Sequence, residues 1–584
     1  MIEYFYECKK HPRKKWNPKR HNPILRLISL LSLVAMVIFI LQIVHLGILP
    51  VRFEIPILGS VLLLTLIIFL FYNFTSRSRL SRFISGLLVI ALTFGYGLGS
   101  YYIYRTDSAI SSVTDLSNKV INNVSFVVMK ESSIKKLSQA SGAKVGITPS
   151  IDSKAMKEAL ADVESSISID TVKYTSYLDE VQALYDGDID AMLLSESYRG
   201  TIYDQEAYQD FNQRTRTVHT THYTTNRKKA IQQSTDAVDV TQEPFTIYVS
   251  GNDSFGTIQE NSRTDSNMLI TVNPTTHTIL MTSIPRDYYE PIVCSADSDS
   301  DCPDGENDKL THSGIYGIST SEQTIENFMD VDINYYVRVN FSSLVNIVDA
   351  VGGVDVKVGK GLAVKQFYTD HTVGGVHEGT NHLNGQKALA YARERYSYTN
   401  GDMQRVKNQQ QVLKALLKKV KSPSMIMNYG NLIDALGGAF ETNLSSDDIR
   451  DFVRMQLLLN SNWKFESYAM IGTPDTRMSA SMGTYASVTL PNKNSITTAR
   501  KKIEAVINGK SSKTVKDTAK QEDTTSESTS TEEYSTDTYS SYGQGYYDYG
   551  QSIPSYSDSS QAQEDSSYSQ QTDDATVVDP NEYQ

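Results

Sequence analysis

Three apolar segments near the start of the chain constrain the fold more than any other feature. They run from about Leu27 to Leu46, from Ile55 to Tyr72 and from Phe83 to Tyr104. About 20 helical residues, rising 1.5 Å each, cross the ~30 Å hydrocarbon core of a bilayer. The first segment lacks the short apolar core and small-residue cleavage site of a signal peptide. We therefore expect three transmembrane helices within residues 27–105.

Basic residues around these segments predict their orientation. Residues 1–26 carry eight Lys and Arg, and three more arginines lie between the second and third segments, whereas the first loop has only Arg52. The positive-inside rule then places the N-terminus and the second loop in the cytoplasm. Three crossings put everything after Arg105 outside the cell. The sequence predicts a multi-pass protein of the cell membrane, with a basic cytoplasmic segment and a large extracellular C-terminal region.

The formal net charge of −12 is unevenly distributed. Residues 1–105 hold 13 basic and 3 acidic side chains (+10), and residues 511–584 hold 3 and 15 (−12), which leaves −10 for the middle. Nucleic-acid binders have basic domains, so a nucleic-acid partner is not expected. Residues 511–584 are rich in Ser, Thr, Tyr and Gln and have almost no aliphatic side chains, which predicts a disordered acidic tail.

The region between the spans and the tail has the pattern of two α/β domains. Residues 106–230 alternate strand and helix signals, and they contain no phosphate-binding loop, metal-spaced His cluster or nucleophile elbow. We interpret them as a small extracytoplasmic accessory domain. Residues 211–242 are polar and predict a linker or an exposed edge. Residues 240–510 alternate again and predict a larger α/β domain, in which Ser319 and Glu322 form a capping box before a helix.

The three cysteines are too few for a disulfide framework. Cys294 and Cys302 flank an acidic stretch and would form a disulfide if that region is extracytoplasmic. Two unpaired surface thiols are the alternative, and the sequence does not choose between them.

Arginines lie beside carboxylates in four segments of the larger domain. The segments are Arg263-Thr264-Asp265-Ser266, Pro285-Arg286-Asp287, Ala388-Leu389-Ala390-Tyr391-Ala392-Arg393-Glu394-Arg395 and Gly401-Asp402-Met403-Gln404-Arg405. We predict the third as a strand, in which a period of two places Tyr391, Arg393 and Arg395 on one face. The fourth predicts the start of a helix with Asp402, Arg405 and Gln409 on one side.

These residue types suit a phosphorylated ligand. The planar fork of arginine matches phosphate oxygens two at a time, and converging arginines would repel one another without an anion. Aspartates at the same place suit a hard cation such as Mg²⁺, which bridges phosphate oxygens. Surface ion pairs are the alternative. The predicted position outside the cell favours a pyrophosphate on a lipid-linked sugar.

The four segments, with Val351-Gly352-Gly353-Val354 and the run from Ala388 to Gln410, resemble the LytR-CpsA-Psr (LCP) family. The resemblance is strong over about Phe245 to Val420 and weaker from there to about Gly509. The three spans, the accessory domain and Tyr391-Ala392-Arg393-Glu394-Arg395-Tyr396 are most similar to its streptococcal CpsA (Wzg) branch. The resemblance implies an α/β/α sandwich around a mixed sheet. It also implies transfer of a glycopolymer, capsular polysaccharide in that branch, from an undecaprenyl-pyrophosphate carrier to peptidoglycan with Mg²⁺ or Mn²⁺. The implied partners are that carrier, peptidoglycan, the lipid bilayer and other capsule-synthesis membrane proteins.

The resemblance also implies roles for individual residues. The pyrophosphate would be bound by Arg263, Arg286, Arg393, Arg395, Arg405 and Gln409. Asp253 and Asp265 would bind the metal. Asp402 would orient Arg405 and accept the proton of the acceptor, which makes it part of a catalytic set with Arg263, Asp265 and Arg286.

Three other functions compete with the transferase. An integral membrane regulator of capsule synthesis or transcription would use the basic N-terminal segment, although the sequence has no helix-turn-helix. A pyrophosphatase would use the same site with water as nucleophile. A sensor would bind the lipid carrier without chemistry.

Overall fold

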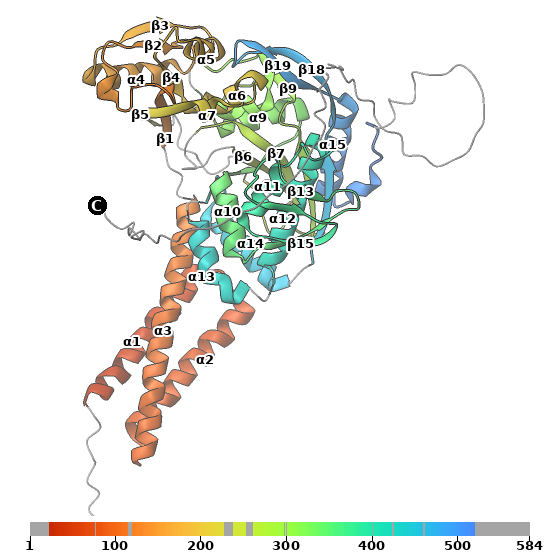
Figure 1. Cartoon of the computed structure of the whole chain (residues 1–584). Helices are drawn as coiled ribbons and strands as arrows, with labels where there is room; N and C mark the ends of the chain where they lie inside the picture. Colours follow the sequence, from red (N-terminus) through yellow and green to blue (C-terminus); the bar gives the residue numbers. More distant parts are fainter. Residues whose placement is uncertain are drawn as a thin grey trace, which may run out of the picture. The chain divides into compact units, whose positions relative to one another are not determined.

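The computed structural model describes residues 23–75, 78–114, 119–226, 237–252, 261–296, 298, 301–399, 401–422, 425–437, 439–459 and 462–519. Figure 1 shows the elements in chain order. The basic segment 1–22 and the tail from residue 520 onward lie outside the described residues, so the predictions made for them stay predictions.

Three helices long and apolar enough to cross a membrane form the N-terminal part. They are α1 (Pro23–Leu46), α2 (Val51–Leu70) and α3 (Arg79–Thr114), and a short π-helix (Phe71–Thr75) follows α2. Large apolar side chains such as Leu41 and Phe94 are exposed along them, as expected for surfaces that face lipid. The helices contain the three predicted spans, and α3 continues ten residues beyond the predicted Tyr104.

Residues 119–226 form a five-stranded sheet in the order β3-β2-β4-β1-β5, in which β2 runs parallel to β3 and β4, and β1 runs antiparallel to β4 and β5. The elements are β1 (Lys119–Met129), β2 (Lys144–Ile147), α4 (Ser153–Ser166), β3 (Asp170–Lys173), α5 (Tyr177–Asp186), β4 (Ala191–Ser195), α6 (Glu196–Tyr203), α7 (Phe211–Arg214) and β5 (Thr215–Asn226). Thr-rich β5 is an edge strand, which agrees with the exposed edge predicted for this polar stretch.

The second domain is built on a six-stranded mixed sheet in the order β16-β11-β6-β7-β8-β17. The β11–β6 and β17–β8 pairs are parallel, and the other pairs are antiparallel. The strands are β6 (Phe245–Asn252), β7 (Thr264–Asn273), β8 (Thr278–Ile284), β11 (Tyr335–Val339), β16 (Phe440–Thr442) and β17 (Lys464–Ala469).

Helices cover both faces of this sheet, because successive strand residues point to opposite sides. On one face, Leu269 and Leu280 pack with residues of α9 (Ile318–Met329) and α15 (Lys493–Ile507). On the other face, Met268 and Met281 pack with residues of α12 (Gly401–Val420) and α14 (Ser446–Leu459). The fold is therefore a mixed α/β sandwich, as predicted.

Shorter elements surround the sandwich (Figure 1). They are β9 (Tyr289–Pro291), β10 (Asn307–Lys309), α8 (Leu310–Ser313), α10 (Phe341–Ala350), β12 (Val354–Val358), β13 (Val364–Gln366), β14 (Gly374–Val376), β15 (Gly379–Leu383), α11 (Gly385–Arg393), α13 (Met425–Leu436), β18 (Gly472–Ser479) and β19 (Thr484–Pro491). Short 3₁₀ turns occupy Leu137–Gln139, Glu206–Tyr208, Gly314–Tyr316 and Ser512–Thr514.

Residues Ala388 to Arg393 belong to the helix α11, where the sequence predicts a strand, and Glu394 is its C-cap residue. Asn384 caps α11 by accepting a hydrogen bond from the Lys387 amide at 3.0 Å. The run from Ala388 to Ala392 is buried without alternation and is rich in alanine, the strongest helix former. The prediction weighed the alternating arginines and overlooked the cap. Tyr391, Arg393 and Arg395 therefore do not share a strand face.

Two helix or domain ends differ from the predicted ones. α9 begins at Ile318, after Gly317 with φ of +112°, so Ser319 is inside the helix and does not cap it. Residues 511–519, which the sequence places in the tail, continue the domain. Ser512 is buried, and its carbonyl accepts a hydrogen bond from Lys502 Nζ at 2.8 Å.

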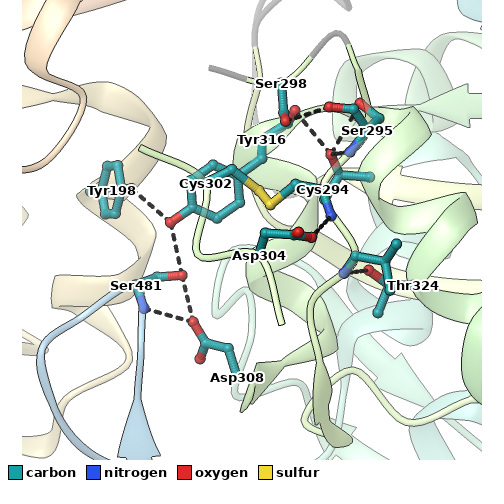
Figure 2. Close-up of a disulfide and its surroundings, with 12 residues drawn as sticks. Tyr198, Cys294, Ser295, Ser298, Cys302, Asp304, Asp308, Tyr316, Thr324 and Ser481 are labelled. Carbon is teal, nitrogen blue, oxygen red and sulfur yellow. Dashed lines mark hydrogen bonds between the residues drawn. A yellow bond between two sulfur atoms is a disulfide. The ribbon is translucent and has the colours of Figure 1, made fainter. Parts of the chain in front are cut away.

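Cys294 and Cys302 form a disulfide across an eight-residue separation, with their Cα atoms 6.1 Å apart. Figure 2 shows this bond beside Tyr316, whose hydroxyl donates to Ser481 Oγ at 3.0 Å and lies 3.3 Å from the Tyr198 hydroxyl of α6. The disulfide-closed segment also contacts the accessory domain, because Asp301 Oδ2 accepts a hydrogen bond from the Ser153 amide at 2.7 Å.

Candidate functional site

The antiparallel pairing of β7 and β8 brings two of the predicted segments together. Asn267 of β7 lies opposite Ile284 of β8, so the start of β7 and the end of β8 share one end of the sheet. Arg263 directly precedes β7, Asp265 is its second residue, and Arg286 follows the end of β8. The backbone of Arg286 is held by its carbonyl, which accepts from the Thr311 amide at 2.8 Å. The register of one hairpin thus assembles three residues of the predicted site.

Arg286 is the centre of this group, and its side chain is only 7% exposed. Its Nη1 donates to Asp265 Oδ1 at 2.7 Å, and its Nη2 donates to Asp204 Oδ2 at 3.2 Å. Its Nε lies 3.6 Å from Asp287 Oδ2. One buried guanidinium therefore faces three carboxylates, and we call these residues with Arg263 and Lys309 the arginine–aspartate cluster.

Lys309 of the cluster and the neighbouring Thr311 were not predicted as site residues. Lys309 Nζ lies 3.4 Å from Asp287 Oδ1, and Thr311 Oγ1 donates to Asp265 Oδ1 at 3.3 Å. Lys309 is the last residue of β10, and Thr311 lies in α8 directly after that strand. A polar pair at the end of a short strand is a signal that sequence inspection could have used.

Asp204 is the other residue that sequence reasoning missed. It is the C-cap residue of α6 in the accessory domain, and it forms ion pairs with Arg263 and Arg286. It lies 59 positions before Arg263 in the chain, and no local pattern connects the two segments. Only the packing of the two domains reveals this contact.

Burial and positive charge act in opposite directions on these carboxyl groups. Burial alone would raise the pKa of Asp265, but the Arg286, Arg263 and Arg405 guanidiniums hold that pKa well below its usual range. In the same way, burial opposes the ionisation of Asp287, while Arg286 and Lys309 lower its pKa to about 2. The pKa of Asp204 is also lowered, because Arg263 and Arg286 outweigh its burial. All three carboxylates are ionised at neutral pH.

The start of α12 borders the cluster. Gln409 Oε1 accepts a hydrogen bond from Ser266 Oγ at 3.1 Å, and Arg405 is close enough to lower the pKa of Asp265 and Asp287. The next residue, Gln410, donates from Nε2 to Ser283 Oγ at 2.9 Å and fixes the helix on the sheet. Asp402 is the second residue of α12, but its side chain is outside the described part, so its predicted role stays a prediction.

Arg393 and Arg395 have different surroundings. The guanidinium carbon of Arg393 lies 4.2 Å from the centre of the Phe341 ring, and that of Arg395 lies 4.5 Å from the centre of the Tyr396 ring. Tyr396 is 60% exposed and packs edge-on against Tyr368, which is 62% exposed. We call Arg393 and Arg395 the outer arginines.

Of the two predicted metal ligands, Asp265 lies among the described residues. Asp253 lies outside the described residues. The described residues contain no group of three His, Cys, Asp or Glu side chains placed to bind a metal ion. The ionised Asp265 nevertheless suits a hard cation, because its bonds from Arg286 and Thr311 both use Oδ1. Such a cation takes one or two carboxylates and completes its shell with phosphate oxygens and water.

The chain matches the model of the LytR_cpsA_psr family over residues 207–502, which are 296 of its 584 residues. The match covers β6 to most of α15, including every residue predicted for the site.

Known proteins with related sequences carry a common name. A protein of Bacillus cereus named polyisoprenyl-teichoic acid–peptidoglycan teichoic acid transferase TagU is 35% identical over 247 residues, which are 42% of this chain and 75% of that protein. A protein of the same name from Bacillus anthracis is 38% identical over 212 residues, 36% of this chain and 63% of that protein. A solved structure of Bacillus subtilis YwtF (TagT) with bound octaprenyl pyrophosphate lipid is 26% identical and covers 47% of this chain and 97% of that chain, with a TM-score of 0.36.

Proposed function

Because the chain belongs to the LytR-CpsA-Psr family, we propose that it is a membrane-anchored transferase that moves a polyprenyl-pyrophosphate-linked glycopolymer onto peptidoglycan. The names of the Bacillus relatives support the reaction class. The three apolar helices support the anchoring. The positive-inside pattern and the Cys294–Cys302 disulfide support a site outside the cell, since disulfides persist in oxidising compartments.

The observation that carries this proposal is the buried cluster around Arg286. Arg263, Arg286 and Lys309 are held almost out of water beside three ionised carboxylates. Fixed cations in a site with little water stabilise a polyanion more strongly than surface cations do, because little solvent screens their charge. A pyrophosphate is an anion of suitable charge, and the fork of each guanidinium can bind two of its oxygens.

The proposed reaction is attack by a peptidoglycan hydroxyl on the phosphorus nearest the sugar. A P–O bond forms to the acceptor oxygen, and the P–O bond to the bridging oxygen breaks, so polyprenyl phosphate leaves with the bridging oxygen. The proton of the acceptor passes to a base, for which Asp402 is proposed. Arg263, Arg286 and Arg405 stabilise the charge that develops on the leaving phosphate.

Mg²⁺ or Mn²⁺ bound by Asp265 and Asp253 would add a further positive charge at the phosphate oxygens. Gln409 and the outer arginines Arg393 and Arg395 complete the proposed pyrophosphate contacts. The polymer proposed is a capsular polysaccharide, on the strength of the three spans and accessory domain that resemble the CpsA branch.

The function is tested with the full chain in phospholipid nanodiscs, a synthetic polyprenyl-pyrophosphate oligosaccharide, peptidoglycan and Mg²⁺. We expect sugar phosphate to become covalently linked to peptidoglycan, and we expect Arg405→Gln to lower the rate at least tenfold. Arg477→Gln, which removes a surface arginine paired with Asp475, is the matched control and should leave the rate unchanged.

Two results would replace the proposal with its competitors. Release of the oligosaccharide phosphate without linkage to peptidoglycan identifies a pyrophosphatase. Binding of the lipid without any turnover, together with altered capsule transcription, identifies a regulator or sensor.

A further inference from the structure

The accessory domain reaches into the proposed catalytic site through one helix. Asp204, the residue that ends α6, forms ion pairs with Arg263 and Arg286, two arginines proposed to bind the pyrophosphate. Its side chain is 17% exposed, and those of the arginines are 4% and 7% exposed. A carboxylate from another domain thus occupies donors that the substrate phosphate needs.

Helix α6 leaves space for the Arg263 guanidinium at Gly200. A Cβ atom on Gly200 would lie 2.5 Å from Nη2 and 2.7 Å from Cζ of the Arg263 guanidinium, so a larger residue there would collide with it. Gly200 and Asp204 are four residues apart, and the Asp204 amide donates to the Gly200 carbonyl at 3.1 Å. Residues at this spacing lie on the same face of a helix. The same face therefore provides both the space for the guanidinium and the anion that pairs with it.

The position of Asp204 is unfavourable for α6 itself. A carboxylate at the C-terminal end of a helix is repelled by the partial negative charge of the last carbonyl groups. The pairing with Arg263 and Arg286 offsets this repulsion. Loss of that pairing would therefore favour departure of Asp204 from its present place.

Uncharged contacts hold the other end of α6. Ser197 Oγ donates to the Asn261 carbonyl at 2.9 Å, and the Tyr198 hydroxyl lies 3.3 Å from the Tyr316 hydroxyl (Figure 2). These contacts involve the first turn, whereas Gly200 and Asp204 lie in the last turns. Asp204 follows the last turn as its cap, so its carboxylate can leave the cluster while Ser197, Tyr198 and the fully buried Ile202 stay in place.

Resting on the proposed function, we propose that Asp204 is an internal competitor for the substrate pyrophosphate. The end of α6 and the pyrophosphate bind the same two guanidiniums and exclude each other. By linkage, any ligand that draws α6 away from the cluster strengthens substrate binding, and bound substrate weakens the docking of α6 by the same factor. The accessory domain then controls the fraction of molecules whose site is open.

The test measures the dissociation constant of octaprenyl pyrophosphate for the full chain in phosphatidylcholine nanodiscs. Asp204→Asn keeps the shape of the side chain and removes its charge. A charge-assisted bond lost from the closed state corresponds to roughly ten- to hundredfold tighter binding of octaprenyl pyrophosphate by Asp204→Asn. Glu196→Gln removes the same charge from the first turn of α6, where Glu196 pairs with Arg199, and should leave the dissociation constant unchanged.

Hydrogen exchange provides an independent measurement on the unmodified chain. The amides of Asp204 and Gln205 donate within α6 and its end. Octaprenyl pyrophosphate should speed exchange in residues 199–205, and Asp204→Asn should speed it without ligand. Unchanged or slower exchange on adding the lipid overturns the proposal, as does equal or weaker binding by Asp204→Asn, which would make Asp204 a positioning residue for the arginines.

A further variant separates this inference from the proposed function. If Arg263→Gln binds octaprenyl pyrophosphate as tightly as the parent, the proposed function fails. If Arg263→Gln binds more weakly but Asp204→Asn does not bind more tightly, only the internal competitor fails.

Discussion

Two carboxyl groups in different domains have pKa values shifted in opposite directions. Glu180, in the accessory domain, accepts a hydrogen bond from Thr148 Oγ1 at 2.5 Å, yet burial raises its pKa to about 8. The Asp265 side chain, in the second domain, is 20% exposed, and Arg286 and Arg263 hold its pKa well below its usual range. Hydrogen bonds alone do not compensate this carboxylate for lost water, whereas two adjacent guanidiniums compensate Asp265.

The opposite pKa shifts distinguish a carboxyl group with a structural role, Glu180, from one that can take part in binding or catalysis, Asp265. At neutral pH, Glu180 is mostly protonated and packs in the accessory core like a polar neutral residue. Asp265 stays charged, and the hydrogen bond that its Oδ1 accepts from Arg286 Nη1 holds the guanidinium in the cluster. The presence of a buried cation, more than burial itself, therefore identifies the site.

The largest expected effect comes from removing the central cation. Arg286→Met leaves Asp204, Asp265 and Asp287 buried without their shared partner. Breaking a buried ion pair by removing one side typically costs about 3–5 kcal/mol. We expect a loss of unfolding free energy of that size, measured by denaturant unfolding of the detergent-solubilised chain. Arg477→Gln, on the surface, is the control and should change it by less than about 0.5 kcal/mol.

A smaller loss in Arg286→Met, below about 1 kcal/mol, would contradict this account of the cluster. It would mean that the three carboxylates take up protons or water without strain, as Glu180 does.

The second effect depends on pH. Because the folded pKa of Glu180 (about 8) is above its ordinary value of 4.5, the folded domain holds a proton that the unfolded chain loses between these pH values. The Glu180 contribution to stability is then full below pH 4.5 and falls by about 1.4 kcal/mol per unit as pH rises toward 8. Glu180→Gln should remove this slope and raise the unfolding temperature at pH 8.

Thermal unfolding at pH 5, 6.5 and 8 measures this slope. Glu158→Gln, an exposed carboxyl on α4, is the control and should keep the parent's pH dependence. A parallel profile for Glu180→Gln would show that Glu180 is ionised in the folded domain.

The smallest effect is expected at the outer arginines. Arg395 stacks on the exposed ring of Tyr396, and an exposed cation–π contact is worth about 0.5–1 kcal/mol. Arg395→Ala should therefore lower the unfolding free energy by no more than about 1 kcal/mol. A loss above 2 kcal/mol would place Arg395 in a buried network like that of Arg286.

Local patterns predicted the parts of the molecule that local forces build. Apolar length identified α1 to α3, and strand periodicity together with the family resemblance indicated the sandwich around the mixed sheet. The helix α11 was missed because the arginine spacing resembled a strand, while the Asn384 cap and the alanines favour a helix. Short-range signals can compete in this way, and only the tertiary packing decides.

Part of the candidate site was predictable because its residues lie in local sequence motifs. Arg263, Asp265 and Arg286 stand in compact motifs next to paired strands, so one hairpin brings them together. Asp204 belongs to another domain and has no neighbouring motif, so its contact with Arg263 depends on how two domains pack. The split between the buried cluster and the outer arginines also follows from burial, which residue type alone does not predict.

Helix α3 is longer than one membrane crossing requires. Its 36 residues, at 1.5 Å each, span about 54 Å, roughly 24 Å more than the hydrocarbon core of a bilayer. The part near its C-terminal end is braced by α13 and α14, where Thr106 meets Tyr429 and Asp107 pairs with Arg450 at 2.7 Å. This bracing fixes the folded domains to the end of α3 that lies beyond its apolar part. For the proposed carrier lipid, whose tail would stay in the membrane, the length of α3 would set how far the pyrophosphate must extend to reach the site.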